Sequence, residues 1–219
     1  MRRHITFVCD GALCAATIDE APGKTGLLIV TGGNELRAGA WNGQALMAAK
    51  IAAAGFPVLR FDRRGIGDSA GGNGGFLSSG PDIAAALAAF RNEIPHLERV
   101  IGFGNCDGAS ALMLAMGTGF DGLLLSNPWT IENDDGEAAA PPPAALRSHY
   151  LQRLRDPGAI RRLLAGKVSL RALAGSLRRA MQPPLPPSSL ALRMAEALAC
   201  FPGQVSILLA ARDRTAQAF

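Results

Sequence analysis

The sequence predicts an α/β fold, a mostly parallel, doubly wound sheet that opens with an antiparallel hairpin. Short apolar runs that stop at glycine alternate with segments of helical spacing, which is the rhythm of a parallel α/β sheet. The N-terminal segment alternates in polarity around the turn dipeptide Asp10-Gly11. At 219 residues, 48% of them hydrophobic and 18% charged, the chain is long enough to bury one substantial core.

The elements that the pattern predicts can be given in chain order. They are a hairpin within 4–18, a buried strand at 25–33, a helix at about 41–54, a strand near 56–62, a helix near 79–94, strands at 99–104 and 122–129 around a helix at 109–116, a helix ending near 200, and a last apolar strand from 203.

This alternation breaks at an acidic and then proline-rich stretch, 132–146, and a second proline-rich break lies at 182–189. The segment between them is helical in pattern and has no predicted strand. We therefore expect a core of residues 1–140 and 188–219 with a helical cap, 141–187, inserted over the carboxyl ends of the strands. The arginines between Arg147 and Arg179 form either a patch for an anionic substrate or membrane surface, or a solvated helical face.

Composition argues against several classes of function. Aromatic residues make up only 5% of the chain and the net charge is +4, which disfavours a nucleic-acid-binding protein. No apolar run is long enough to span a bilayer and none follows the basic N-terminus, so we expect a cytoplasmic protein without an integral membrane segment. The four cysteines lack C-x-x-C spacing, so we expect reduced thiols, no metal site and no cofactor.

The pentapeptide Gly104-Asn105-Cys106-Asp107-Gly108 carries the main functional signal. It fits G-x-C-x-G, the cysteine form of the nucleophile elbow, and it lies between a predicted strand and a predicted helix. Gly104 and Gly108 are the elbow glycines, where a side chain would collide with backbone in so sharp a turn. The amino end of the helix should favour a thiolate at Cys106. The alternative is a small buried cysteine in a glycine-rich turn.

The segment "TGGNELRAG", which begins at Thr31 after the first buried strand, is the candidate oxyanion loop. Enzymes of this architecture hold the oxyanion with two backbone N–H groups, one from the residue after the nucleophile and one from this earlier loop. The candidates are Asp107 and either Gly33 or Asn34. Glu35 and Arg37, in the same loop, are candidates for facing the substrate. The alternative is an ordinary tight turn at the two glycines.

Asp213, just past the last predicted strand, is the leading candidate for a carboxylate that orients a catalytic histidine. The alternative is a surface carboxylate paired with Arg212 or Arg214.

The segment "FDRRGIGDS" matches the D-x-R-G-x-G-x-S loop of the α/β-hydrolase superfamily, which the chain resembles. Together with "GGNE", "GNCD" and "HYLQRL…LLAGKVSLRALAGSL", it most resembles the small hydrolases associated with the exosortase A system of bacteria, and these segments cover most of the chain. The resemblance implies an α/β-hydrolase fold and a setting in exopolysaccharide production and protein sorting, with exosortase or polysaccharide-system proteins as partners. A dienelactone-hydrolase-like thiol site is the nearest well-understood relative of the elbow.

The resemblance predicts a hydrolase or transferase that acts on a small acyl substrate through Cys106. The histidines are His4, His96 and His149, and the first two lie in positions typical of solvated surface residues. A triad histidine in this fold follows the acid, so we expect a member that lacks its last strand, histidine and closing helix. His149, at the start of the cap, is the one substitute. The alternative from another class is an inactive protein of this fold that serves in binding or assembly.

Overall fold

A computed structural model describes residues 1–131, 186–211, 213, 216 and 219. The strands are β1 (Arg2–Cys9), β2 (Ala12–Asp19), β3 (Thr25–Val30), β4 (Val58–Phe61), β5 (Arg99–Asn105), β6 (Gly122–Ser126) and β7 (Gln204–Leu208). The helices are α1 (Gly43–Ala53), α2 (Gly80–Glu93), α3 (Asp107–Leu114) and α7 (Ser189–Ala199), with short 3-10 turns at Ala40–Asn42 and Phe76–Ser78.

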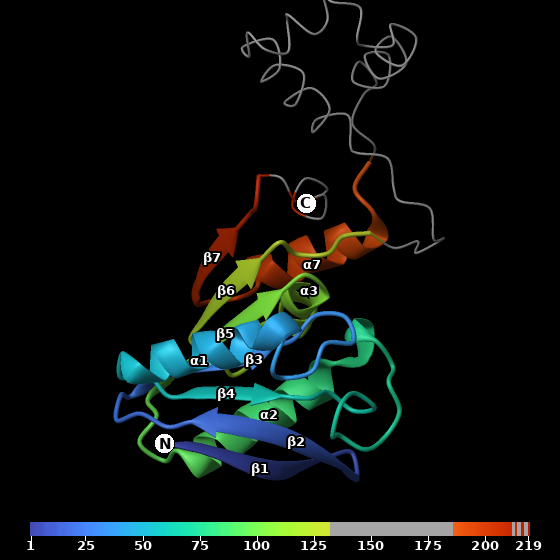
Figure 1. Ribbon diagram of the computed structural model, residues 1–219. Helices are drawn as coiled ribbons and strands as arrows, with labels where there is room; N and C mark the ends of the chain where they lie inside the picture. Colours follow the sequence, from blue (N-terminus) through green and yellow to red (C-terminus); the bar gives the residue numbers. More distant parts are fainter. Residues whose placement is uncertain (132–185, 212, 214–215, 217–218) are drawn as a thin grey trace, which may run out of the picture.

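In the described parts of the chain these seven strands form one sheet in the order β1-β2-β4-β3-β5-β6-β7 (Figure 1). β2 pairs antiparallel with β1 and with β4, and every other pairing is parallel. The predicted fold class, a mostly parallel sheet that opens with an antiparallel hairpin, is confirmed.

The opening hairpin turns where the sequence predicts. Asp10 and Gly11 have φ of 47° and 79°, and Cys9 pairs with Ala12 across the two-residue loop. Two positive φ angles in succession are the mark of a type I′ turn, whose twist matches that of the strands it joins. The Asp-Gly dipeptide is suited to this turn because both residues tolerate positive φ.

Helices cover the sheet on both faces (Figure 1). On one face α1 packs Ala48 against Ile29 and Val58 in a small apolar cluster. On the other face, α2, α3 and α7 contribute to the main core, for example through Phe90, Leu112 and Met194 respectively. All four residues of β4 are buried, as expected of a strand that has a layer on each side.

Two boundaries differ from the prediction. Helix α3 begins at Asp107 rather than at 109, so Cys106 itself is the residue that precedes the first turn. Helix α1 begins two residues later than predicted because a 3-10 turn with left-handed Trp41 comes first. The predicted cap lies outside the described residues, except for its last two positions. Among the described residues, no helix is long and apolar enough to cross a bilayer.

Candidate functional site

Cys106 lies on a strained turn between β5 and α3. Its φ and ψ are 57° and −128°, a region that a side-chain-bearing residue rarely adopts. Its N–H donates to the Ser126 carbonyl at 2.9 Å, and its own carbonyl accepts from the N–H of Ala109 at 3.1 Å. The thiol is half-buried at the edge of the sheet where the parallel strands end. That edge is where α/β folds place their ligands.

Two glycines allow this turn to close. A Cβ on Gly104 would lie 2.6 Å from the Ala109 nitrogen, and a Cβ on Gly108 would lie 2.5 Å from the Val30 carbonyl oxygen. Both contacts are with backbone, which cannot rotate aside. The turn therefore has the geometry of a nucleophile elbow, with α3 held close against the end of β3.

The loop after β3 touches the elbow directly. A Cβ on Gly32 would come within 2.6 Å of the Asn105 carbonyl oxygen and 3.3 Å of the Cys106 Cβ. The next residue, Gly33, has φ of 54°, and its carbonyl accepts from the buried Arg63 guanidinium. Arg63 also donates to the Ser79 hydroxyl at 2.9 Å. Arg63 therefore anchors this loop from beneath, a role that sequence reasoning missed.

The two predicted sources of oxyanion N–H groups contact each other. The N–H of Gly33 donates to the carboxylate of Asp107. Asn34, the other candidate, uses its side-chain oxygen to accept from Asn73 at 2.9 Å. The Asp107 side chain thus occupies the N–H of Gly33, one of the two candidate donors of this loop. An oxyanion can use Gly33 only after that carboxylate moves or gains a proton.

The thiol of Cys106 is less acidic than the helix argument predicts. Burial raises the pKa of Cys106, and the Asp107, Asp213 and Glu35 carboxylates raise it further, while the backbone N–H of Asp107 acts in the opposite direction. The amino end of α3 acts in the expected direction, but the thiolate that it was expected to favour is opposed by larger effects. Desolvation and three negative charges outweigh one helix end.

Asp213 and Glu35 both lie near enough to Cys106 to act on its charge. Asp213 follows β7, and its carboxylate accepts from the Ala216 N–H at 3.3 Å. Asn127 holds this region: its N–H donates to the Leu208 carbonyl, and its side-chain oxygen accepts from the Ala210 N–H at 2.8 Å. Asn127 therefore links the end of β6 to the loop that carries Asp213. Its φ of 46° is left-handed, a conformation that asparagine tolerates, so the residue type is the only hint of this role in the sequence.

The D-x-R-G-x-G-x-S segment is structural in this chain. Asp62, fully buried, accepts from the backbone N–H groups of Arg37 and Asp68. Arg64 forms two side-chain bonds to Asp82, both at 3.0 Å. The Ser69 hydroxyl donates to the Asp62 carbonyl at 2.7 Å. The segment thus ties the loop after β4 to the start of α2.

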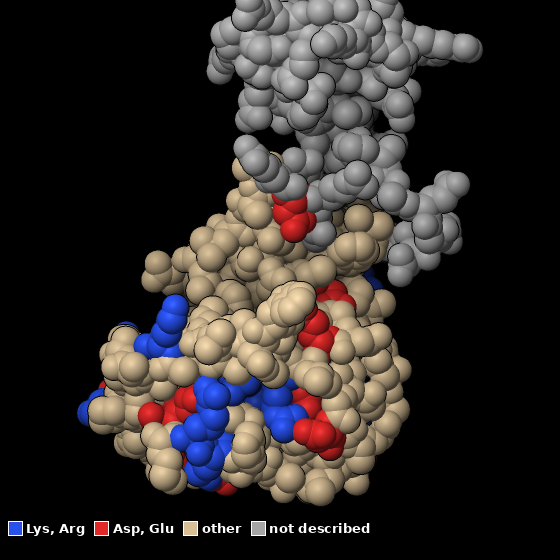
Figure 2. All heavy atoms as spheres, viewed as in Figure 1, with Lys and Arg blue, Asp and Glu red and all other residues tan. Residues whose placement is uncertain are grey.

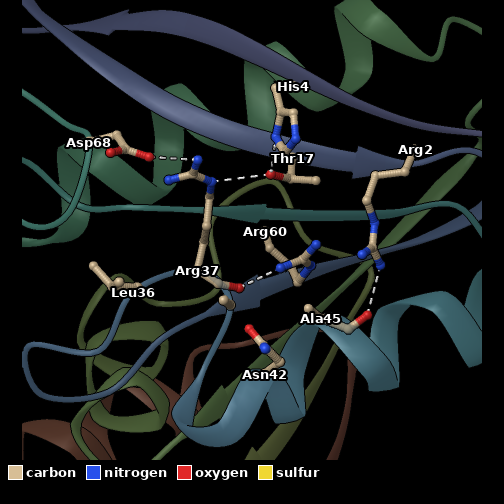
Figure 3. Close-up of a pocket in the computed structure, with 10 residues that line it drawn as sticks. Arg2, His4, Thr17, Leu36, Arg37, Asn42, Ala45, Arg60 and Asp68 are labelled. Carbon is tan, nitrogen blue, oxygen red and sulfur yellow. Dashed lines mark hydrogen bonds and ion pairs between the residues drawn. The ribbon is translucent and has the colours of Figure 1, made fainter.

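Arg37 was a candidate for facing the substrate, and the structure places it elsewhere. It pairs with Asp62 and with Asp68, and it lines a separate cavity together with Thr17 and Arg60 (Figure 3).

Neither described histidine reaches Cys106. His4 lies on β1, four strand spacings from β5, which corresponds to about 19 Å. His96 lies in the loop before β5, at the opposite end of that strand from the elbow. The third candidate, His149, lies outside the described residues. Within those residues, the site consists of a thiol, two loop amides and three carboxylates.

No family model and no curated protein matches the chain. Solved structures do. The esterase Pf2001 from Pyrococcus furiosus superposes with a TM-score of 0.60 at 14% identity over 98% of this chain and 72% of that one. The alpha/beta hydrolase GrgF from Penicillium sp. sh18 gives 0.57 at 16% identity over 99% and 84%. DcsB, solved with a substrate analogue, gives 0.53 at 19% identity over 74% of this chain and 55% of that one.

The chain has the α/β-hydrolase fold. It spans just over half the length of the DcsB chain that it matches. At these identities the likeness concerns the fold alone, and chemistry has to be argued from the site.

Replacing Asp107 by asparagine should make Cys106 more reactive at neutral pH. A raised pKa leaves less thiolate at pH 7, so removing one of the negative charges that raises it shifts the thiol titration to lower pH. We expect alkylation by iodoacetamide at Cys106 to become several-fold faster at pH 7 in Asp107→Asn, with the pH midpoint of the rate moved down. Mass-spectrometric mapping of the rate against pH checks this. An unmoved or higher midpoint contradicts it.

Proposed function

We propose that the protein is a thiol-dependent acyl hydrolase or transferase in which Cys106 is the nucleophile. The observation that carries the proposal is the strained elbow, with φ of 57°, between β5 and α3 and in contact with the Gly32-Gly33 loop. That arrangement presents a nucleophile to a bound carbonyl with backbone donors beside it. Esterases and hydrolases among the structural neighbours support the same class of reaction.

The reaction has two steps. The Cys106 thiolate attacks the carbonyl carbon, a thioester bond forms, the carbon–oxygen bond of the ester breaks, and the alcohol leaves with a proton. Water or another acceptor then adds to the thioester carbon, the carbon–sulfur bond breaks, the acid or the transferred acyl product leaves, and the acceptor's proton returns the Cys106 sulfur to its starting state. The N–H groups of Gly33 and Asp107 hold the developing oxyanion once the Asp107 carboxylate is displaced. Asp213 would orient the imidazole that shuttles the proton.

Ester hydrolysis tests the proposal. With p-nitrophenyl acetate, the protein should release nitrophenolate in a burst of up to one equivalent, and Cys106→Ala should abolish the burst. Cys200→Ala, which removes the one exposed cysteine among the described residues, should leave it unchanged. A burst that survives Cys106→Ala would overturn the proposal.

Turnover after the burst reports on the base. General acid–base catalysis raises the reaction rate by on the order of 10²–10⁴-fold. Without an imidazole, deacylation of Cys106 is therefore slow, and nitrophenolate release stops near one equivalent. If His149 supplies the base, His149→Ala should keep the burst and lose the steady state.

The second candidate function is an inactive α/β-hydrolase-fold protein that acts in binding or assembly. The raised pKa of the Cys106 thiol and the distance of both described histidines favour it. Absence of any Cys106-dependent burst across acetate, butyrate and thioester probes is the result that this candidate predicts.

The proposed setting is bacterial exopolysaccharide production with an exosortase system, and it rests on the resemblance carried by "GGNE", "RFDRRGIGDS" and "GNCD". The expected result is altered exopolysaccharide output in a strain whose protein carries Cys106→Ala. Normal output in that strain would contradict the setting and leave the chemistry of the elbow untouched.

A further inference from the structure

The elbow binds one of its own charged groups where a substrate oxygen would lie. The N–H of Gly33 points at the elbow and donates to the Asp107 carboxylate. The backbone N–H of Asp107, the other predicted donor, bonds to the Cys106 sulfur and opposes the rise in its pKa. A negatively charged oxygen thus already lies on a donor that could hold the oxyanion of a tetrahedral intermediate.

Three features hold the Asp107 carboxylate in this position. It accepts from the Gly33 N–H, and it belongs to the first residue of α3, where the partial positive charge of the helix end favours an anion. It also lies close enough to the buried Arg63 guanidinium to counteract the lowering of the Arg63 pKa by burial. The same three features would stabilise an oxyanion, so the carboxylate mimics the charge of the reaction intermediate.

The loop that carries Gly33 is held firmly, whereas the Asp107 side chain is not. A Cβ on Gly32 would lie 2.6 Å from a backbone oxygen at the end of β5, so the loop and the elbow touch. Arg63 donates to the Gly33 carbonyl, and the Gly32 carbonyl accepts from the Glu35 N–H at 3.1 Å. Asp107 is only half-buried, so its carboxylate can leave by rotation about side-chain bonds. Freeing the Gly33 N–H therefore needs a rotamer change and no movement of the loop.

No exposed cation of the described residues is gathered at the elbow to take up the displaced carboxylate. Figure 2 shows basic side chains gathered over β2 and β4, in the lower part of the view, whereas acidic ones also lie higher up, toward β7. The buried Arg63 already donates to the Ser79 hydroxyl and to the Gly33 carbonyl. The displaced Asp107 carboxylate therefore turns toward water or toward a hydrogen-bond donor on the substrate.

We propose that Asp107 is a positioning residue that closes the oxyanion site in the free protein, and that a bound ester opens it by displacing the carboxylate from Gly33. The proposal rests on the proposed acyl chemistry of Cys106. The hydrogen bond of the Gly33 N–H passes from the carboxylate to the oxyanion, and Asp107 itself forms and breaks no covalent bond. A charge-assisted hydrogen bond has to be broken before the oxyanion is held, so an ester with few other contacts reacts slowly.

Two reactions of the same thiol separate this effect from a change in thiol acidity. Attack on an ester builds an oxyanion, whereas alkylation by iodoacetamide displaces iodide at a saturated carbon and builds none. We define the acylation ratio as the rate constant for acetylation of Cys106 by p-nitrophenyl acetate divided by that for its alkylation, both at one pH. A change in the thiolate fraction alters both rate constants and cancels in this ratio.

Two variants of the full chain separate the charge of Asp107 from its hydrogen bond. Asp107→Asn removes the charge and keeps an oxygen that can accept from Gly33, whereas Asp107→Ala removes both. Alanine is a good helix former, so α3 should keep its first turn, and circular dichroism checks the fold.

Asp121→Ala is the matched control. The Asp121 carboxylate also accepts from a backbone N–H, that of Val100 at 2.7 Å. Val100 lies at the opposite end of β5 from the elbow, six residues before Cys106, which corresponds to about 20 Å. The acylation ratio of this variant should stay within about twofold of the parent.

We expect the acylation ratio to rise by about tenfold or more in Asp107→Ala, because no charge-assisted bond has to be broken. In Asp107→Asn it should rise less, because the amide oxygen still accepts from Gly33. A ratio in Asp107→Ala that is no higher than in Asp107→Asn, or than in the parent, would overturn the proposal and leave Cys106 as the nucleophile. No acetylation of Cys106 in any variant would instead overturn the proposed function, and this proposal with it.

Discussion

Substituting alanine for Gly108 is expected to slow acylation of Cys106 by about a hundredfold or more. The new Cβ would lie 2.5 Å from the Val30 carbonyl oxygen and 2.9 Å from that of Thr31, both backbone atoms at the end of β3. Helix α3 must then move away from the sheet and take the elbow with it. A displacement of about 1 Å in a reacting group costs on the order of 10²-fold in rate. The rate of nitrophenolate release in the burst measures the effect.

Gly43→Ala is the matched control. Gly43 begins α1 with φ of −58°, and no atom outside its own helix and chain neighbours lies within 4 Å of its ideal Cβ. Alanine there should leave the burst intact and stabilise the fold by up to about 1 kcal/mol, because it restricts the unfolded chain and favours the helix. Equal burst rates in Gly108→Ala and the parent would show that the elbow tolerates a shift of α3.

Asp82→Ala should lower the free energy of unfolding by about 1–3 kcal/mol, the cost of leaving the N–H donors that bond this buried carboxylate without their acceptor. The Asp82 side chain is 4% exposed and accepts three hydrogen bonds from Arg64, one from its backbone N–H and two from its guanidinium. Bonding to Asp82 raises the pKa of Arg64, and a guanidinium stays charged at neutral pH even without that partner. Asp10 compensates little from the surface, since its side chain is 63% exposed. Urea unfolding measures the difference.

Glu98→Ala gives the comparison for an exposed pair. Glu98 and Lys24 lie 2.6 Å apart, but their side chains are 64% and 67% exposed, so water screens them. The free energy of unfolding should therefore change far less than in Asp82→Ala. If both variants unfold at the same urea concentration, the D-x-R-G-x-G-x-S segment does not hold the fold in the way that its contacts indicate.

Local patterns sufficed for most of the fold. Asp10-Gly11 can be predicted as a turn because its own backbone preferences decide the conformation, and β4 because a continuous apolar run has to be covered on both faces. The boundary of α3 was missed by two residues. Asp107 and Gly108 are poor helix formers in isolation, and the close contact of Gly108 with β3 is what holds them in the first turn.

The site was predictable in place and less so in chemistry. The G-x-C-x-G spacing located the elbow, but it contains nothing about Glu35 and Asp213, which come from distant segments and raise the pKa of Cys106. The bond from Gly33 to the Asp107 carboxylate likewise depends on tertiary contact. The pairing of Arg37 with the buried Asp62, 25 residues away, also could not be seen in the local sequence.

The position of the acyl group after a single turnover tests the central claim most directly. The protein is mixed with excess p-nitrophenyl acetate, quenched in acid within the burst, digested, and mapped by mass spectrometry. We expect one acetyl group per chain, on Cys106, as a thioester that hydroxylamine removes, and none on the buried Cys9 and Cys14. Acetyl groups found on lysines or on Cys200, with Cys106 unmodified, would contradict Cys106 as the nucleophile.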